Sequence, residues 1–256
     1  MGKFERDKEL LAPIFEKVEA GMEISDAERM IAASTVYASY HDSGKIEGLI
    51  SVDSSAQGCE FCKLMREIAE KLKANGNDKH ICGLCYATKG HFRYKTVKNR
   101  HELNMAILSE IQFKPGDFKG MGLYGLIRIN SDGDIRNVTH AKNIIVMMND
   151  NPIARFGWWG KNINAIVEAC DELGKPKNCT LVASSFLIGK PIKLPKYFDY
   201  VFTVYETDED VAEAVANGAA ECNGKHCRDC GFMCYLGVDN GWKYGTNIAE
   251  KVRKMR

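Results

Sequence analysis

Hydrophobic residues recur with a period close to 3.6 over residues 7–20, and this spacing predicts an amphipathic helix there. Ser25, followed three residues later by Glu28, forms a capping-box pattern that predicts the start of a second helix, which we expect to run to residue 38. After Gly44 the pattern alternates over residues 45–53, as in a short strand. The chain is therefore expected to begin with a helical region that leads into a strand.

The middle of the chain passes from polar helices to a regular alternation of strands and helices. Residues 59–73 and 96–111 have helical spacing. After them we predict strands at residues 123–129, 154–159, 180–184 and 200–205, separated by helices at residues 138–148, 162–173 and 208–216. This order predicts an α/β fold, a partial βα barrel or an open parallel sheet, with too few strands for a closed eight-stranded barrel.

These patterns divide the chain into four zones. We expect a helical N-terminal region with a short strand at residues 1–53, and helices with the first cysteines at residues 54–115. A core of βα repeats is expected at residues 116–220, and a cysteine-rich segment with a tail at residues 221–256.

Composition and charge narrow the function classes. The 35 basic and 34 acidic residues nearly balance, whereas a dedicated duplex-DNA binder carries a basic excess. The N-terminus lacks the apolar stretch of a signal peptide, and no apolar run reaches the length of a membrane span. We therefore expect a cytoplasmic protein without a membrane partner, in which ten cysteines indicate metal or redox chemistry rather than disulfides.

Four cysteines fall in the segment ECNGKHCRDCGFMCY and are called the second cysteine group: Cys222, Cys227, Cys230 and Cys234. The first three have the C-x4-C-x2-C spacing of plant-type ferredoxin ligands, and the last completes a set of four thiolates. Tetrahedral zinc and a [4Fe-4S] cluster both accept four thiolates. The spacing therefore predicts a metal site and leaves the identity of the metal open.

Two C-x-x-C pairs make up the first cysteine group: Cys59, Cys62, Cys82 and Cys85. Such pairs are typical of zinc ribbons, but the first pair begins a predicted helix. A helix N-terminus stabilises thiolates and favours an anionic cluster, so we expect iron–sulfur ahead of zinc. The two remaining cysteines are expected in the hydrophobic core as small apolar residues: Cys170 and Cys179.

A polar loop follows the first strand of the βα core, at the edge where parallel sheets build ligand sites. The polar segment spans residues 128–134, and its last five residues, Asn130, Ser131, Asp132, Gly133 and Asp134, are called the polar loop. Gly133 lets a ligand approach the backbone, and Asp134 is suited to a hydroxyl, an amine or a cation. In the alternative interpretation the loop is a solvated turn, and Asp134 caps the following helix.

The next two strands end in further candidates. Trp158 and Trp159 point to opposite faces, so we expect one in the core and the other in the floor of a pocket. Lys161 is placed to hold a carboxylate or phosphate, unless it is an ordinary lysine at a helix start. The pair Ser184–Ser185 forms a third wall or an N-cap. The HFRYK run at residues 91–95 has the aromatic and basic residues of a single-strand nucleic-acid site, although we favour an ordinary strand or turn.

The segments CGLCYATKGHFRY, LIRINSDGDI, ARFGWWGKN, CTLVASS and ECNGKHCRDCGFMCY occur in one order along the chain. In this order they resemble the phage gene product 88-like proteins, over about residues 45–235. That family occurs in phages, prophages and other mobile elements, so the resemblance implies such an origin. The family pattern is matched by Cys82, Cys85, Gly133, Asp134, Lys161 and the second cysteine group.

A second resemblance implies a mechanism. A Cys-x-x-Cys-Tyr-Ala segment, a helix, a strand that ends in a Gly-acid turn and further βα units are similar in order to radical S-adenosylmethionine enzymes. In that superfamily three cysteines hold a [4Fe-4S] cluster whose fourth iron binds the cofactor, and the Gly-acid turn contacts the amino group of the cofactor. The resemblance implies that three cysteines of the first group are ligands and that Asp132, Gly133 and Asp134 lie near the cofactor. The chain departs from the superfamily because the compact C-x3-C-x2-C motif is absent, and four thiolates are able to close the site.

Two functional hypotheses follow. In the first, the chain is an iron–sulfur enzyme of the radical type that acts on a small-molecule or nucleic-acid substrate, with an auxiliary cluster at the second cysteine group. In the second, zinc or iron–sulfur sites brace a non-catalytic protein that binds nucleic acid or a protein partner.

Overall fold

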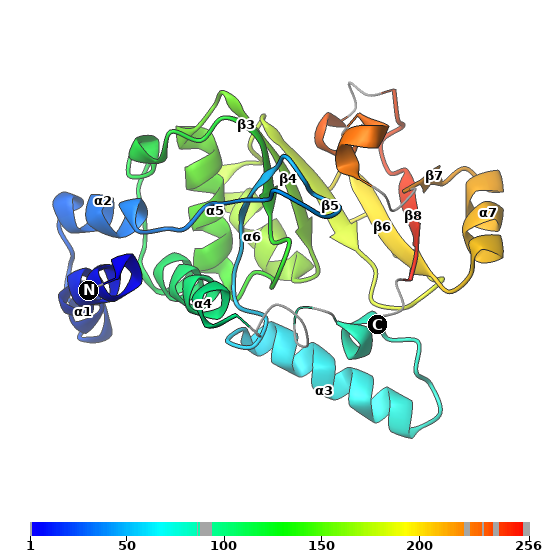
Figure 1. Ribbon diagram of the computed structural model, residues 1–256, viewed down its shortest axis with the longest axis horizontal. Helices are drawn as coiled ribbons and strands as arrows, with labels where there is room; N and C mark the ends of the chain where they lie inside the picture. The colour runs from blue at the N-terminus through cyan, green and yellow to red at the C-terminus, as the bar shows by residue number, and fades with distance from the viewer. Residues whose placement is uncertain are drawn as a thin grey trace.

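The computed structural model describes residues 2–85, 87, 94–222, 226–231, 233–237 and 241–252. These residues form a mixed α/β fold around an open eight-stranded sheet, in the order β1-β2-β3-β4-β5-β6-β8-β7 (Figure 1). Neighbouring strands are parallel except for β1 and β2. The strands are β1 (Ser39–Tyr40), β2 (Ile50–Val52), β3 (Gly125–Ile129), β4 (Ala154–Gly160), β5 (Cys179–Ser184), β6 (Tyr200–Tyr205), β7 (Ala220–Glu221) and β8 (Asn247–Lys251). The predicted α/β class is confirmed, as the open sheet rather than a barrel.

Seven α-helices lie in the described residues: α1 (Lys3–Glu19), α2 (Asp26–Ser34), α3 (Glu60–Ala74), α4 (Lys95–Glu110), α5 (Val138–Asp150), α6 (Ile163–Leu173) and α7 (Asp208–Ala216). Short 3₁₀ helices include η1 (Ile81–Leu84), η4 (Lys119–Met121), η5 (Cys227–Cys230) and η6 (Met233–Tyr235). The predicted capping box of Ser25 and Glu28 starts α2. That helix ends at Ser34, before the predicted residue 38. The hydroxyl of its C-cap, Thr35, donates to the carbonyl of Ala32 at 2.7 Å.

One face of the sheet is covered by α4, α5 and α6, which lie beside β3, β4 and β5 in Figure 1. Ile127, Phe156 and Cys179 stand in register across these strands and are buried in the main core. Trp158 belongs to the same core, as do the two cysteines expected there. Each Å² of apolar surface that is buried stabilises the fold by about 25 cal/mol. This layer is therefore the main stabilising element of the fold.

The opposite face carries a smaller cluster built on Trp159 and Tyr235, whose rings are 5.3 Å apart. Tyr235 comes from η6, which packs on β4 and β5. Gly157 makes this contact possible, because a Cβ atom there would lie 2.6 Å from both aromatic rings. The second cysteine group is therefore carried on the face of the sheet opposite to the helices.

The sheet extends further along the chain than the sequence predicted. β8 lies between β6 and β7, within residues that were assigned to a tail. β1 and β7 have two residues each, too few to leave an alternating pattern. The division into four zones stays a prediction, although the sheet draws strands from more than one zone. Among the described residues, no helix is both long enough and apolar enough to cross a membrane.

The close contact at Gly157 gives a first prediction. Gly157→Ala should lower the free energy of unfolding by about 1–3 kcal/mol, because the added methyl group overpacks the contact with Tyr235. The matched control is Gly120→Ala, where an added Cβ meets no atom within 4 Å. Denaturant unfolding of both variants measures the difference, and equal stabilities would contradict the packing described here.

Candidate functional site

The first cysteine group gathers where α3 and η1 meet the loop after β3. Cys59 is the N-cap of α3 and is fully buried, and Cys62 lies in the first turn of the helix. Cys82 lies in η1, Cys85 directly follows it, and η1 packs against α3. Electrostatic interactions join Cys59 to Cys62, Cys62 to Cys85, and Cys85 to Cys82. The four cysteines are therefore neighbours in space, as their spacing suggested.

Burial and hydrogen bonding divide these thiols by acidity. A hydrogen bond from the Cys62 thiol lowers the pKa of Cys59, and the backbone amides of Cys62 and Phe61 act in the same direction. This is the effect expected for a cysteine at a helix N-terminus. The same thiol–thiol bond and burial raise the pKa of Cys62, and burial raises the pKa of Cys82 to about 11.

Asp134 connects the polar loop with the first cysteine group. Its Oδ1 accepts a hydrogen bond from the amide of Ile135 at 2.7 Å, and its Oδ2 accepts one from the amide of Lys161 at 2.8 Å. Burial raises the pKa of this carboxyl group. The carboxylate adds to the raised pKa of Cys62 and partly offsets the lowered pKa of Cys59. Asp134 thus ties the loops after β3 and β4 together and places a negative charge beside the thiols.

The expectation that Asp134 caps the next helix is wrong. Asn137 is the N-cap of α5, and its side-chain oxygen accepts a hydrogen bond from the amide of His140 at 2.8 Å. The cap lies three residues later than predicted because Asp134 is already engaged by amides of its own loop and of the loop after β4.

Gly133 and Asn130 adopt left-handed backbone conformations, with φ of 76° and 55°. A Cβ atom at Gly133 would lie 2.2 Å from the carbonyl oxygen of Ser54, so this neighbouring backbone requires the glycine. The Oδ1 atom of Asn130 accepts a hydrogen bond from the Ser54 hydroxyl at 3.1 Å. Its buried Nδ2 atom has no hydrogen-bond partner among the described residues, which makes it a donor free for a ligand.

Lys161 lies at the end of β4, close to Cys82 and His80. Its ammonium group counteracts the raised pKa of Cys82 and lowers the pKa of His80, which burial lowers most. His80 is buried, and its Nδ1 atom accepts a hydrogen bond from the amide of Cys82 at 3.3 Å. Arg66 on α3 is a second cation within range of Cys82. Sequence reasoning missed His80 and Arg66, although His80 precedes Cys82 by only two residues.

A buried carboxylate pair lies beside the polar loop. Asp53, directly after β2, accepts hydrogen bonds on Oδ1 from the amide and hydroxyl of Ser131, at 2.6 and 2.7 Å, and from the amide of Asp132 at 3.1 Å. Burial raises the pKa of Asp132 to about 7, and Asp53 adds to the shift. Asp132 was predicted and Asp53 was missed, although the parallel pairing of β2 and β3 brings both strand ends to one edge.

Asp53 is also linked to the surface. Its Oδ2 atom accepts a hydrogen bond from the Ser51 hydroxyl, and the Nε2 atom of His41 lies 2.7 Å from that hydroxyl. His41 is half-buried. A chain of hydrogen bonds therefore runs from a half-buried imidazole to the buried carboxylates.

The second cysteine group gathers on the other face of the sheet. Cys227 and Cys230 bound η5, Cys234 lies in η6, and Cys222 follows β7. Cys234 interacts electrostatically with the other three thiols. Burial raises the pKa of Cys234 to about 12 and also raises the pKa of Cys227. This set too is close in space as well as in sequence.

Two cations adjoin the second cysteine group. The Nζ atom of Lys45 lies 2.6 Å from a carboxylate oxygen of Glu250, and Lys45 also interacts with Cys222. Arg128 on β3 counteracts the raised pKa of both Cys227 and Cys234.

The guanidinium group of Arg128 lies 3.4 Å from the ring centroid of Trp159. Trp159 thus lies on the face opposite to Trp158, as predicted, and supports a cation beside the second cysteine group. Lys45 was not a candidate from sequence, and Arg128 was noted only as the start of the polar segment at residues 128–134, because no motif connects either residue to the cysteines.

Within the described part of the chain, no three or more His, Cys, Asp or Glu side chains form a finished metal-binding group. The thiols of each group interact with one another without converging on one point. All eight ligand assignments therefore stay predictions, and metal binding would require the thiols to rotate and lose their protons.

Two further candidates have other placements. The Ser185 hydroxyl lies 3.0 Å from that of Thr203, and the chain between β5 and β6, all of it described, contains no α-helix for the pair Ser184–Ser185 to cap. In the HFRYK run, residues 91–93 lie outside the described residues, and Lys95 begins α4.

Comparison with known proteins places the chain in a family. The model of a family described as gene product 88 matches residues 49–246, which is more than half of the chain. No curated protein and no solved structure matches the chain. The similarity to radical S-adenosylmethionine enzymes therefore rests on the residues alone.

The carboxylate pair predicts a specific pH dependence of stability. The pKa of Asp132 is about 7 in the folded protein and about 3.9 when unfolded, so the folded state binds more protons between these values. Stability should therefore fall as the pH rises from about 4 to about 7, by at most about 1.4 kcal/mol per pH unit from this group. Asp132→Asn should remove this component, whereas Asp78→Asn, at an exposed position, should retain it. Unfolding at a series of pH values tests this, and parallel profiles for the wild type and Asp132→Asn would count against it.

Proposed function

We propose that this chain, which belongs to the gene product 88 family, is an iron–sulfur protein with a reactive cluster at the first cysteine group and an auxiliary cluster at the second. The proposal further assigns it to the enzymes that use S-adenosylmethionine. The observation that carries it is the opposite charge beside the two groups. A buried carboxylate, Asp134, adjoins the first group, where the cations Lys161 and Arg66 act at Cys82, whereas the cations Lys45 and Arg128 adjoin the second.

The donor set of each group fits an iron–sulfur cluster or zinc, because thiolates are soft ligands and four are present. Each thiolate that binds adds one negative charge to the site. At the second group Lys45 and Arg128 offset that charge, which favours a closed set of four ligands. At the first group Asp134 opposes ionisation of the thiols, most fully at Cys62, because hydrogen bonds favour the thiolate at Cys59 and Lys161 and Arg66 favour it at Cys82. This difference favours fewer thiolates and an open coordination position.

The surroundings of the first group are suited to a charged polar cofactor. The free Nδ2 donor of Asn130 and the ammonium group of Lys161 are available to carboxylate or hydroxyl oxygens, and Asp132 adds a second buried carboxyl group to the polar loop. When bound, a reduced cluster of this kind supplies the single electron that cleaves S-adenosylmethionine. The protein residues orient the cofactor and hold its charges in a buried setting.

The alternative is a non-catalytic protein braced by zinc or iron–sulfur sites. Two observations favour it. Both carboxylate oxygens of Asp134 are already engaged by backbone amides, and the Ser54 backbone alone accounts for Gly133. On this hypothesis all four cysteines of the first group bind one metal, and the polar loop is structural.

Single Cys→Ala variants distinguish an open site from a closed one. After purification without oxygen, the wild type should be brown and contain iron and sulfide in equal amounts, with about eight irons per chain. Replacing any cysteine of the second group should remove about half of the iron. In the first group three variants should do the same, and one should retain its cluster. Cys170→Ala, in the core, is the control and should leave the iron content unchanged. Colourless protein with stoichiometric zinc contradicts the proposal, and loss of the cluster in all four first-group variants favours the alternative.

The enzymatic part needs a separate test. Dithionite-reduced protein is mixed with S-adenosylmethionine without oxygen, and 5′-deoxyadenosine is measured by chromatography. The wild type should produce it, and the first-group variants that lose their cluster should not. Protein that contains the first cluster and still produces no 5′-deoxyadenosine would rule out the radical mechanism while leaving the iron–sulfur assignment in place.

A further inference from the structure

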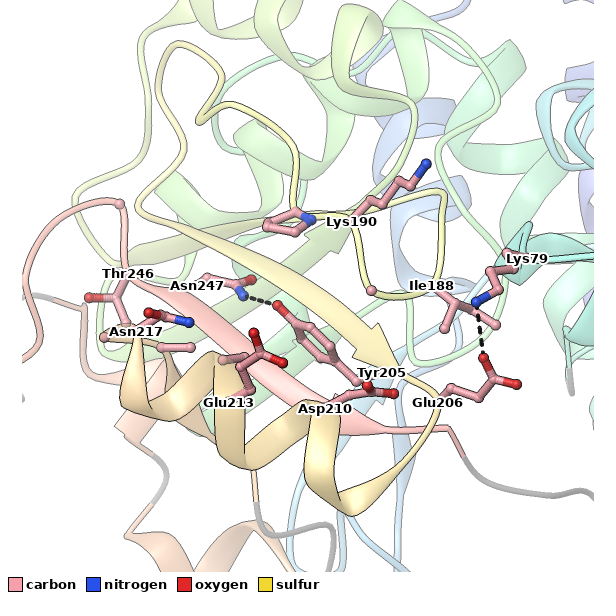
Figure 2. A pocket seen from close by; sticks show the side chains of 16 residues that line it. Lys79, Ile188, Lys190, Tyr205, Glu206, Asp210, Glu213, Asn217, Thr246 and Asn247 are labelled. Carbon is pink, nitrogen blue, oxygen red and sulfur yellow. Dashed lines mark hydrogen bonds and ion pairs between the residues drawn. The ribbon is translucent and has the colours of Figure 1, made fainter.

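A polar groove of about 690 Å³ opens between α7 and the loop at residues 188–191 (Figure 2). Its floor includes Tyr205 from β6 and Asn247 from β8. It lies on the face of the sheet that α7 covers, whereas the second cysteine group lies on the opposite face. Neither cysteine group lines it.

The groove exists because the helical layer is incomplete. β5 and β6 are joined by a loop in place of a helix, so α7 has no neighbouring helix on that side. On the same face, β3, β4 and β5 carry apolar residues, whereas β6 and β8 carry Thr203 and Asn247. Polar groups on the inner face of a sheet are costly to bury unless they are hydrogen-bonded.

A directed chain of hydrogen bonds satisfies these polar groups and leaves one donor at its end. Thr203 donates to Oδ1 of Asn247 at 2.8 Å, and Nδ2 of Asn247 donates to the Tyr205 hydroxyl at 2.9 Å. Ser185 therefore donates to Thr203, at 3.0 Å. The Tyr205 oxygen accepts, so its own hydrogen is left to donate into the groove.

The opposite wall supplies an acceptor. Several charged groups of the lining are already engaged. Lys79 lies 3.2 Å from Glu206, and Asp210 accepts a hydrogen bond from the amide of Thr207 at 3.0 Å. Glu213 on α7 has no such partner among the described residues, and Figure 2 shows it directed into the groove beside Tyr205. The ammonium group of Lys190 points away from Tyr205 in the same view.

We propose that this groove binds a polyhydroxylated ligand of the carbohydrate class. A hydroxyl group is the one common function that accepts from the Tyr205 hydroxyl and donates to the Glu213 carboxylate through the same atom. Phosphate is an anion that the Glu213 carboxylate would repel, and an ammonium group donates only and leaves Tyr205 without an acceptor. The amide of Asn217, also in the lining, serves a second hydroxyl. The inference is independent of the metal sites.

Isothermal titration of the full-length protein tests this with three probes. D-glucose represents a free sugar, maltotriose a glycan and adenosine the ribose of a nucleoside. At least one should bind saturably, and the probe that binds identifies the source. Tyr205→Phe, which removes only the hydroxyl, should raise its dissociation constant at least about tenfold. Glu213→Gln should weaken it as well, and Glu209→Gln, on α7 outside the groove, is the matched control.

Thermal unfolding checks that Tyr205→Phe is folded, and Glu213→Gln, at an exposed position, provides a test that does not depend on the buried ring. The inference is overturned when none of the three probes binds saturably, or when both variants bind as tightly as the wild type. It is also overturned when putrescine or inorganic phosphate binds the groove in a Tyr205- and Glu213-dependent way and the sugars do not.

Discussion

Thiols buried side by side cannot all ionise unless a cation joins them, and this constraint governs both cysteine groups. Burial and mutual repulsion raise the pKa of Cys82 and Cys234, to about 11 and about 12. All ten cysteines are free thiols, so no disulfide relieves this repulsion. A bound metal removes the conflict, because it takes the thiolate form and compensates its charge. We propose that the surrounding charges then decide how many thiolates each site accepts.

The parallel sheet brings the loops beside the first cysteine group together at one edge. Parallel strands bring their carboxyl ends to one edge, so Asp53 after β2 and the polar loop after β3 meet there, and the loop after β4 joins them. Asp134 and Asp53 are held by backbone amides, which fixes the loops without help from a ligand. The edge is therefore organised before any cofactor binds, a condition for precise placement of one.

The sequence predicted the parts of this arrangement that depend on neighbouring residues, and it did not predict the parts that depend on tertiary contacts. Periodicity located the long elements well, because α4, β6 and α7 each span enough residues to establish a period. It failed for β1 and β7, which have two residues each, and for β8, which pairs with strands distant in the chain. Spacing identified both cysteine groups, and the turn chemistry identified the polar loop. Lys45, Arg128, Asp53 and His80 were not found, because each becomes part of a site only through tertiary contacts.

The groove beside α7 was not predicted from the sequence, because it too forms only through tertiary contacts. Its polar chain from Ser185 to Tyr205 joins two strands and a loop that are distant in sequence. Only Ser185 was noticed beforehand, and for a different role. The groove forms because a loop, and not a helix, joins β5 and β6. Sequence patterns predict the helices that are present, but they do not predict the space that a missing helix leaves.

The central claim, that both cysteine groups hold iron–sulfur clusters, is tested most directly by X-ray absorption at the iron and zinc edges on protein purified without oxygen. The account predicts iron surrounded by sulfur, with a second shell of iron neighbours, and little zinc. Zinc in a four-sulfur shell without iron, or the absence of both metals, would contradict it.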